Sequence, residues 1–162
     1  MTRALTEAAY MPAILVTTQT TSGRTQLSFC DNGAALDPEQ VSQLYAAIRS
    51  GRIGTIRRAV EGGTADGVVG RLGVALLASF AIADQIIICT RGGLGPGTRY
   101  TCDTRTYRSE RYVVSRPGTV IQLRVRRERG ELHDIATVRA ALMPHARELE
   151  LPIRVGADPN PL

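Results

Sequence analysis

The chain has 162 residues, of which 43% are hydrophobic and 22% charged, a balance typical of a globular domain. All twenty basic residues are arginine, so any mechanism that needs a lysine nucleophile or a lysine on a phosphate is excluded. No apolar run reaches the ~18 residues that cross a bilayer, and the start carries no secretory cleavage pattern. We therefore expect a soluble, cytoplasmic chain without membrane contacts.

The positions of the cysteines and of the arginines both narrow the kinds of site that this chain can carry. Cys30, Cys89 and Cys102 are odd in number and widely spaced, which is typical of buried thiols rather than a disulfide framework or a zinc site. Residues 99–129 carry nine arginines and three acids, a net +6, whereas the remainder carries −1. Because arginine alternates there with Thr, Tyr and Val, the segment favours the solvated face of antiparallel strands over a nucleic-acid patch.

The first third of the chain predicts helix, hairpin and helix in turn. Hydrophobic spacing gives a short helix at 3–11, two hairpin strands at 14–18 and 25–30, and a helix that starts at Asp37 with Pro38 in its first turn. The second strand is broken by Asp31-Asn32-Gly33. The helix that starts at Asp37 has one buried face, made by Val41, Leu44, Tyr45 and Ile48.

The remainder predicts a long glycine-rich loop, a buried helix and a sheet. Glycines and polar residues fill 51–67, and a loop of this length within a domain usually has a function. After it we expect a buried helix at 74–83, strands at 84–91, 98–106, 111–114 and 120–125, a helical region at 131–150 broken near Pro144, and a strand at 151–155. The pattern predicts a two-layer α/β sandwich (α+β): a mixed, mostly antiparallel sheet with helices on one face. We assign residues 1–156 to one domain and 157–162 to a linker or tail.

Three short motifs occur in a fixed order: Asp31-Asn32-Gly33 between strand and helix, Gly70-Arg71-Leu72-Gly73 before the buried helix, and Gly118-Thr119 opening a late strand. Together they resemble the nucleotide-binding domain shared by the gyrase, heat-shock chaperone, histidine kinase and mismatch-repair ATPases (GHKL). Within that superfamily, residues 67–85 are similar to the heat-shock protein 90 chaperones of the bacterial type. The resemblance covers about residues 3–156 and implies a Bergerat-type ATP-binding fold.

The resemblance implies a role for each matching residue at the adenine. The carboxylate at Asp31 would accept a hydrogen bond from the adenine amino group. Gly33 would let the backbone pass close to the base, and Leu36 would pack on the ring. Thr119 falls where a hydroxyl of the family supports the aspartate.

The same resemblance places the phosphates and a lid. Gly70 and Gly73 would let bare amides approach the phosphates, with Arg71 beside them as a further contact or a solvated turn residue. Ser50 and Gly51 would begin a lid that closes over bound nucleotide.

The catalytic pair of the family is altered. In one frame Glu7 replaces the magnesium-binding asparagine and Arg3 replaces the general base; in the other Glu7 is the base and Met11 falls at the magnesium position. A guanidinium takes no proton from water, and a thioether is a poor ligand for magnesium. Ala35 and Ala75 replace two glycines of the family, and the start of the chain is shorter, as in a truncated or divergent relative.

We therefore expect an ATP- or ADP-binding domain of a heat-shock protein 90-like chaperone, with Mg²⁺ as a further cofactor. Nucleotide-dependent lid closure would assist the folding of client proteins together with the rest of a chaperone chain, in a homodimer, with hydrolysis weak or lost. One alternative is an ATP-binding protein of the anti-sigma-factor or histidine-kinase type. The other is a nucleotide-free interaction module that uses its arginine-rich strands as the contact.

Overall fold

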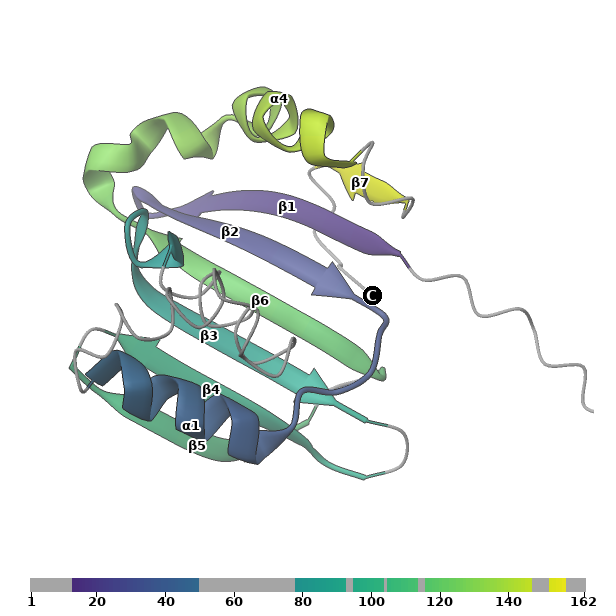
Figure 1. Cartoon of the computed structure of the whole chain (residues 1–162). Helices are drawn as coiled ribbons and strands as arrows, with labels where there is room; N and C mark the ends of the chain where they lie inside the picture. The colour runs from purple at the N-terminus through teal and green to yellow at the C-terminus, as the bar shows by residue number, and fades with distance from the viewer. Residues whose placement is uncertain are drawn as a thin grey trace, which may run out of the picture.

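The computed structural model describes residues 13–49, 78–92, 95–103, 105–113, 116–146 and 152–156 (Figure 1). These residues form a seven-stranded sheet in the order β5-β4-β3-β6-β2-β1-β7. The strands are β1 (Ile14–Thr21), β2 (Arg24–Asp31), β3 (Ala83–Arg91), β4 (Gly97–Asp103), β5 (Tyr107–Tyr112), β6 (Gly118–Val125) and β7 (Ile153–Val155). All pairs are antiparallel except β1 with β7, so the predicted mixed, mostly antiparallel sheet is confirmed.

The predicted first hairpin is confirmed, and its strands are longer than predicted. β1 and β2 pair from Ile14 opposite Asp31 to Thr21 opposite Arg24. The two residues between them, Ser22 and Gly23, both have positive φ, 52° and 71°. A two-residue turn of this kind matches the right-handed twist of the strands it joins. The local sequence therefore decided this element.

The predicted strands at 98–106 and 111–114 have the wrong boundaries. β4 ends at Asp103 because the Asp103 carboxylate accepts hydrogen bonds from the backbone of Arg105 (2.7 Å) and Thr106 (2.6 Å), which turns the chain. The next strand then begins at Tyr107, four residues earlier than predicted. Alternating Arg, Thr and Tyr runs through both strands and the turn, so the pattern alone did not locate the turn.

The helices α1 (Pro38–Arg49) and α4 (Ile135–Ala146) begin at aspartate caps. In α1 the Asp37 carboxylate accepts the N–H of Glu39 at 2.7 Å, as the sequence predicted. The predicted helical region at 131–150 is divided differently: a 3-10 helix, η1 (Arg127–His133), precedes α4. The division lies at Asp134, whose carboxylate accepts the N–H of Ala136 and of Thr137. Pro144 lies inside α4, so the predicted break there is wrong.

The predicted buried helix at 74–83 lies mostly outside the described residues. Of its last residues, 78 and 79 are helical, 80–82 form a turn, and Ala83 already belongs to β3. Ala83 is fully buried, as are Ile86 and Ile88 further along the strand, whereas Asp84 directly after it is exposed. An apolar run that passes from helix into strand carries no signal for where the change occurs.

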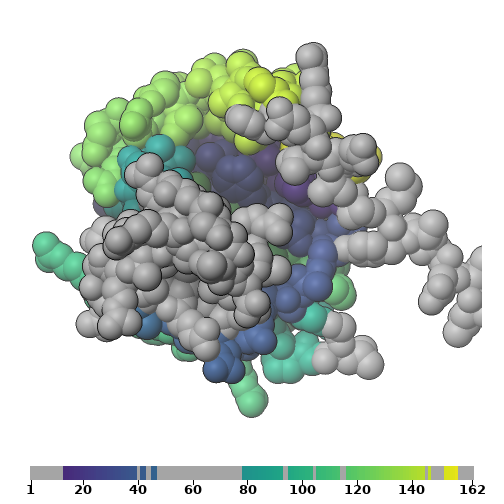
Figure 2. Space-filling view, viewed as in Figure 1, coloured from purple at the N-terminus to yellow at the C-terminus, as the bar shows by residue number. Residues whose placement is uncertain are grey.

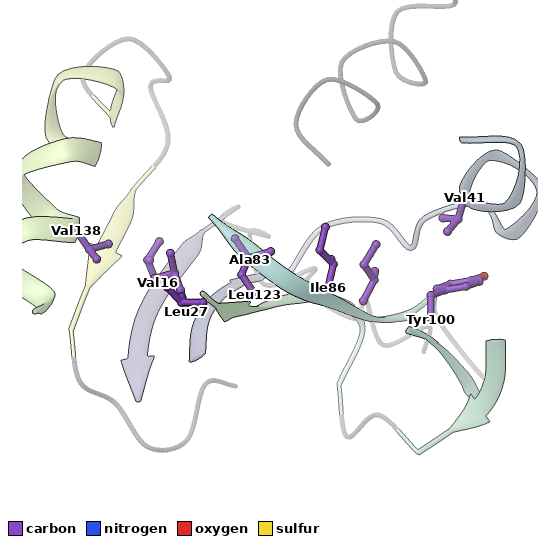
Figure 3. Packing of buried hydrophobic residues seen from close by; sticks show 10 residues of the cluster. Val16, Leu27, Val41, Ala83, Ile86, Tyr100, Leu123 and Val138 are labelled. Carbon is purple, nitrogen blue, oxygen red and sulfur yellow. The ribbon is translucent and has the colours of Figure 1, made fainter. Parts of the chain in front are cut away.

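Both helices cover the same face of the sheet, as predicted. Figure 1 shows α1 in front of β4 and β5, and α4 beside β1 and β7. Between them the core contains Val16, Leu27, Ile86 and Leu123 from the strands, together with Val41 from α1 and Val138 from α4 (Figure 3). On the molecular surface η1 and α4 form a green-to-yellow rim next to the purple first strands (Figure 2). The two-layer α/β sandwich is thus confirmed.

All three cysteines are free and buried. Cys30 and Cys89 flank Val120 in one row of the sheet, two strand spacings or about 10 Å apart, which is too far for a disulfide. Burial raises the pKa of Cys30 to about 11, with a smaller effect from the Asp31 charge, and burial raises the pKa of Cys102 to about 12. The thiols are therefore protonated at neutral pH, which excludes them as thiolate nucleophiles.

Candidate functional site

A row of polar side chains crosses four neighbouring strands at one end of the sheet. Asp31 ends β2 and lies opposite Thr119 of β6, which lies opposite Thr90 of β3, which lies opposite Thr98 of β4. These positions share the face of Leu27, Leu123 and Ile86, the face that the helices cover, because side chains on one face recur at every second residue. The row therefore borders the apolar core rather than open solvent.

The Asp31 carboxylate is held by two backbone amides. Its Oδ1 accepts the N–H of Gly33 at 2.8 Å, and the backbone N–H of Thr119 donates to the same carboxyl group. Asp31 is half-buried, and burial raises the pKa of its carboxyl above 3.8, an effect that the two hydrogen bonds oppose. A carboxylate has about four acceptor positions, so these two bonds leave capacity for a ligand donor.

Gly33 lies so close to this carboxylate that a side chain would collide with it. A Cβ at residue 33 would stand 2.9 Å from Oδ1 of Asp31. The Asp31-Asn32-Gly33 motif also fixes the start of β1, because Oδ1 of Asn32 accepts the N–H of Ala13 at 2.8 Å. The turn thus positions the carboxylate and ties it to the neighbouring strand.

Thr90 is a site residue that sequence reasoning missed. Its buried hydroxyl lies 3.0 Å from the Thr119 hydroxyl, accepts the N–H of Leu36 at 3.0 Å, and is 3.5 Å from the carbonyl oxygen of Gly118. It therefore joins the end of β3 to the β2–α1 loop and to the start of β6. A threonine at the end of an apolar strand is common, and only the strand pairing reveals what Thr90 contacts.

The Gly118-Thr119 motif brings β6 against the end of β2. Gly118 has φ 131°, and a Cβ there would lie 2.1 Å from the carbonyl oxygen of Asp31. No side chain fits in that space without moving the backbone, and L residues rarely adopt this φ. Glycine at 118 is thus a condition for the Asp31–Thr119 pairing.

The structure brings together Asp31, Gly33, Leu36 and Thr119 of the predicted site, and adds Thr90 to them. Leu36 is partly buried and packs against the core, while its backbone N–H holds Thr90. The buried Tyr100 hydroxyl, two residues from Thr98 on the same face of β4, has no hydrogen bond of good geometry. A half-buried carboxylate with acceptor positions to spare, next to apolar side chains, can accept a hydrogen bond from an amino donor of a ligand.

The other predicted site residues, Glu7, Ser50, Gly51, Gly70, Arg71 and Gly73, lie outside the described residues. Within the described ranges no group of three or more His, Cys, Asp or Glu side chains is arranged to hold a metal ion. A magnesium ligand set is therefore not part of the geometry above. Among the same residues, no helix is both long and apolar enough to cross a membrane.

Two known proteins to which this chain is similar are both HtpG chaperones. No protein-family model matches the chain. It is similar to the chaperone protein HtpG of Streptomyces coelicolor, with 28% identity over 145 residues, 83% of this chain and 23% of the relative. It is also similar to the chaperone protein HtpG of Salinispora tropica, with 29% identity over 143 residues, 82% of this chain and 22% of the relative.

The chain thus spans less than a quarter of the length of the curated relatives it matches. The aligned part nevertheless covers most of the chain, including the segments that carry the polar row. These similarities support a distant relationship of this chain to the heat-shock protein 90-like chaperones.

Proposed function

We propose that this chain is a nucleotide-binding domain that holds the adenine of ATP or ADP at the Asp31 carboxylate. The observation that carries the proposal is the placement of a half-buried carboxylate in register with Thr119 and Thr90, beside an apolar surface. An adenine amino group would donate to Asp31, and a charged acceptor in such surroundings contributes ~1.5 to 3 kcal/mol. Thr119 and Thr90 would orient the carboxylate and the loop that carries Leu36.

The phosphate end of the nucleotide would lie toward Gly70, Arg71 and Gly73, with Ser50 and Gly51 at the base of a closing lid. These roles rest on the sequence resemblance and on the similarity to HtpG. Glu7 would serve as a carboxylate ligand to Mg²⁺ or as the general base, but not both. We therefore expect tight nucleotide binding to be separable from hydrolysis, which would be weak or absent.

The binding would serve a chaperone of the heat-shock protein 90 type in the cytoplasm. In this proposal the chain responds to nucleotide by lid closure and acts on client proteins, as a homodimer or with further chaperone domains. The support is the similarity of most of this chain to a short part of HtpG chaperones.

Calorimetric titration with ATP, in the presence and absence of Mg²⁺, tests the proposal. The parent chain should release heat, and Asp31→Ala should abolish it. Asp31→Asn keeps an acceptor for the Gly33 amide but loses the charge, so its dissociation constant for the nucleotide should rise about tenfold or more. Asp84→Asn is the matched control, because Asp84 is an exposed acid at the other end of the sheet.

Two outcomes would contradict the proposal. Equal binding by the parent and Asp31→Ala would mean that nucleotide is held elsewhere on the chain. No heat from the folded parent would favour the nucleotide-free interaction module. A phosphate-release assay on the same samples measures hydrolysis separately, and transfer of labelled phosphate to a protein partner would indicate the kinase-type alternative.

A further inference from the structure

A second region with concentrated polar groups lies at the opposite end of the same strands. The β1–β2 turn, the start of β3 and the junction of β6 with η1 meet there (Figure 1). Two adjoining cavities of about 300 and 430 Å³ open at this end and share Val125, Arg126 and Arg127 as lining residues. We call this surface the arginine corner and define it by Arg24, Arg124, Arg126 and Arg127.

Arg126 belongs to the framework of the arginine corner. Its guanidinium donates to the carbonyl oxygens of Phe80 (3.0 Å) and Ala83 (3.3 Å) and lies 3.9 Å from the Glu128 carboxylate. It therefore ties the start of β3 to the end of β6. Each of its three guanidinium nitrogens makes one of these contacts, so Arg126 shapes the corner rather than recognising a ligand.

The other three guanidinium groups are available to a ligand. Arg24, Arg124 and Arg127 are exposed, and none of them has a hydrogen bond or ion pair from its side chain to another described residue. The acids that line the same cavity, Asp84 and Glu128, do not neutralise the four arginines. A surplus of unpaired guanidinium around a concave surface attracts carboxylates and phosphates, often through paired hydrogen bonds.

The lining of the two cavities favours a carboxylate ligand over a nucleic acid. Neither cavity is lined by an aromatic side chain on which a base could stack. Asp84 and Glu128 would also repel a continuous phosphate backbone, whereas spaced carboxylates can meet the arginines and avoid these two acids. Because the two cavities share lining residues they are adjacent, and one extended chain can reach both.

We propose that the arginine corner binds an extended acidic segment of a partner polypeptide, whose Glu or Asp side chains pair with Arg24, Arg124 and Arg127. This site is independent of the Asp31 end and requires no nucleotide. Lining a cavity distinguishes these three arginines from other exposed arginines of the chain. Arg108 and Arg111, for example, are equally exposed on β5, but line neither cavity.

Fluorescence anisotropy on the full chain tests this proposal, at about 150 mM salt so that long-range attraction is screened. The probe is a labelled peptide of about eight residues that alternates Glu with Ser, roughly 26 Å long when extended. The double variant Arg24→Ala/Arg127→Ala should raise the dissociation constant about tenfold. The control Arg108→Ala/Arg111→Ala removes the same charge and should change it less than about twofold.

Thermal unfolding of each variant checks that the fold is kept, and Arg124→Ala supplies a second, independent probe of the corner. Equal weakening by both double variants would reduce the effect to net charge and overturn the proposal. So would the absence of peptide binding to the folded parent. Tighter binding of an oligothymidine through Arg24 and Arg127 would overturn it in favour of a nucleic-acid site.

Discussion

The two ends of the same strands use polar residues in opposite ways. At the Asp31 end, Thr90 and Thr119 are buried and bond to each other, while at the arginine corner Arg24, Arg124 and Arg127 are exposed. Buried polar groups need partners, so at the first end they fix the backbone of three strands and a loop. Solvated guanidinium groups carry no such constraint and remain free to bind.

The register of β2, β6 and β3 also decides on which face of the sheet the polar side chains at each end lie. Gln26 lies opposite Arg124, and Asp31 lies opposite Thr119, five residues further along β2. The two positions fall on opposite faces, since side chains alternate along a strand. Asp31 and Thr119 therefore point toward the helices and the core, whereas Gln26 and Arg124 point away.

The largest expected effect comes from closing the space between β2 and β6. Gly118→Ala should destabilise the chain by more than about 3 kcal/mol, because its methyl group would meet the Asp31 carbonyl oxygen in a strained backbone conformation. Gly95→Ala is the matched control: Gly95 has the same φ of 131° but no atom within 4 Å of the added Cβ. It should cost about 1 to 2 kcal/mol. Urea unfolding measures both, and equal losses would mean that the close approach is relaxed at no cost.

A smaller effect on the free energy of unfolding is expected from the pair of threonine hydroxyls at each end of the strands. Thr90→Val should cost about 1 to 3 kcal/mol, because it leaves the Leu36 amide and the Thr119 hydroxyl without their partner. Thr90→Ser keeps the hydroxyl and should recover most of this loss.

The control at the other end is Thr20→Val, since the Thr20 and Thr25 hydroxyls are also 3.0 Å apart but exposed. Water replaces that bond, so the free energy of unfolding should change by less than about 0.5 kcal/mol. A loss at Thr20 as large as at Thr90 would show that burial is not what separates the two ends.

The smallest effects are in the pH dependence, and they have opposite signs. Burial raises the pKa of Asp31, so its contribution to stability is full below the unfolded value of 3.8 and is lost as pH rises through the folded pKa. Hydrogen bonds from Ala136 and Thr137 lower the pKa of Asp134, so its contribution is present above 3.8 and is lost as pH falls.

Urea unfolding between about pH 2 and pH 7 measures this difference. Relative to the parent, Asp31→Asn should gain stability as the pH rises, and Asp134→Asn should lose it. The same sign for both variants would contradict the assigned environment of at least one carboxyl group.

Much of the fold could be predicted from short-range patterns. The hairpin of β1 and β2, the start of α1 after Asp37, and β3 and β6 all follow from alternating or continuous apolar runs and from capping residues. The errors lie where local signals compete: at Asp103, whose carboxylate ends β4 within an alternating pattern, and at Asp134, which begins a helix inside a longer apolar periodicity. At both positions the aspartate carboxylate sets the boundary, because it accepts the backbone N–H groups of the residues two and three positions later. Hydrophobic periodicity does not register such a hydrogen bond.

The candidate site could be predicted only in part. Asp31, Gly33, Leu36 and Thr119 were indicated by motifs and by resemblance, and the structure brings these residues together. Thr90 was not indicated, since its hydroxyl acts on Leu36 and Thr119 from more than twenty residues away in the chain. Long-range contacts of this kind leave no mark in a local pattern.

The sequence by itself determined that arginine is the basic residue of this protein, where most of its strands lie and that Asp37 caps α1, because these properties depend on composition and on neighbours within a few residues. Only the tertiary structure decided that Thr90 holds the loop beside Asp31, that glycine is required at 118, and that Arg24 lies beside the three arginines at positions 124, 126 and 127. Strand register sets these contacts, and register is the sum of many weak pairings across the whole sheet.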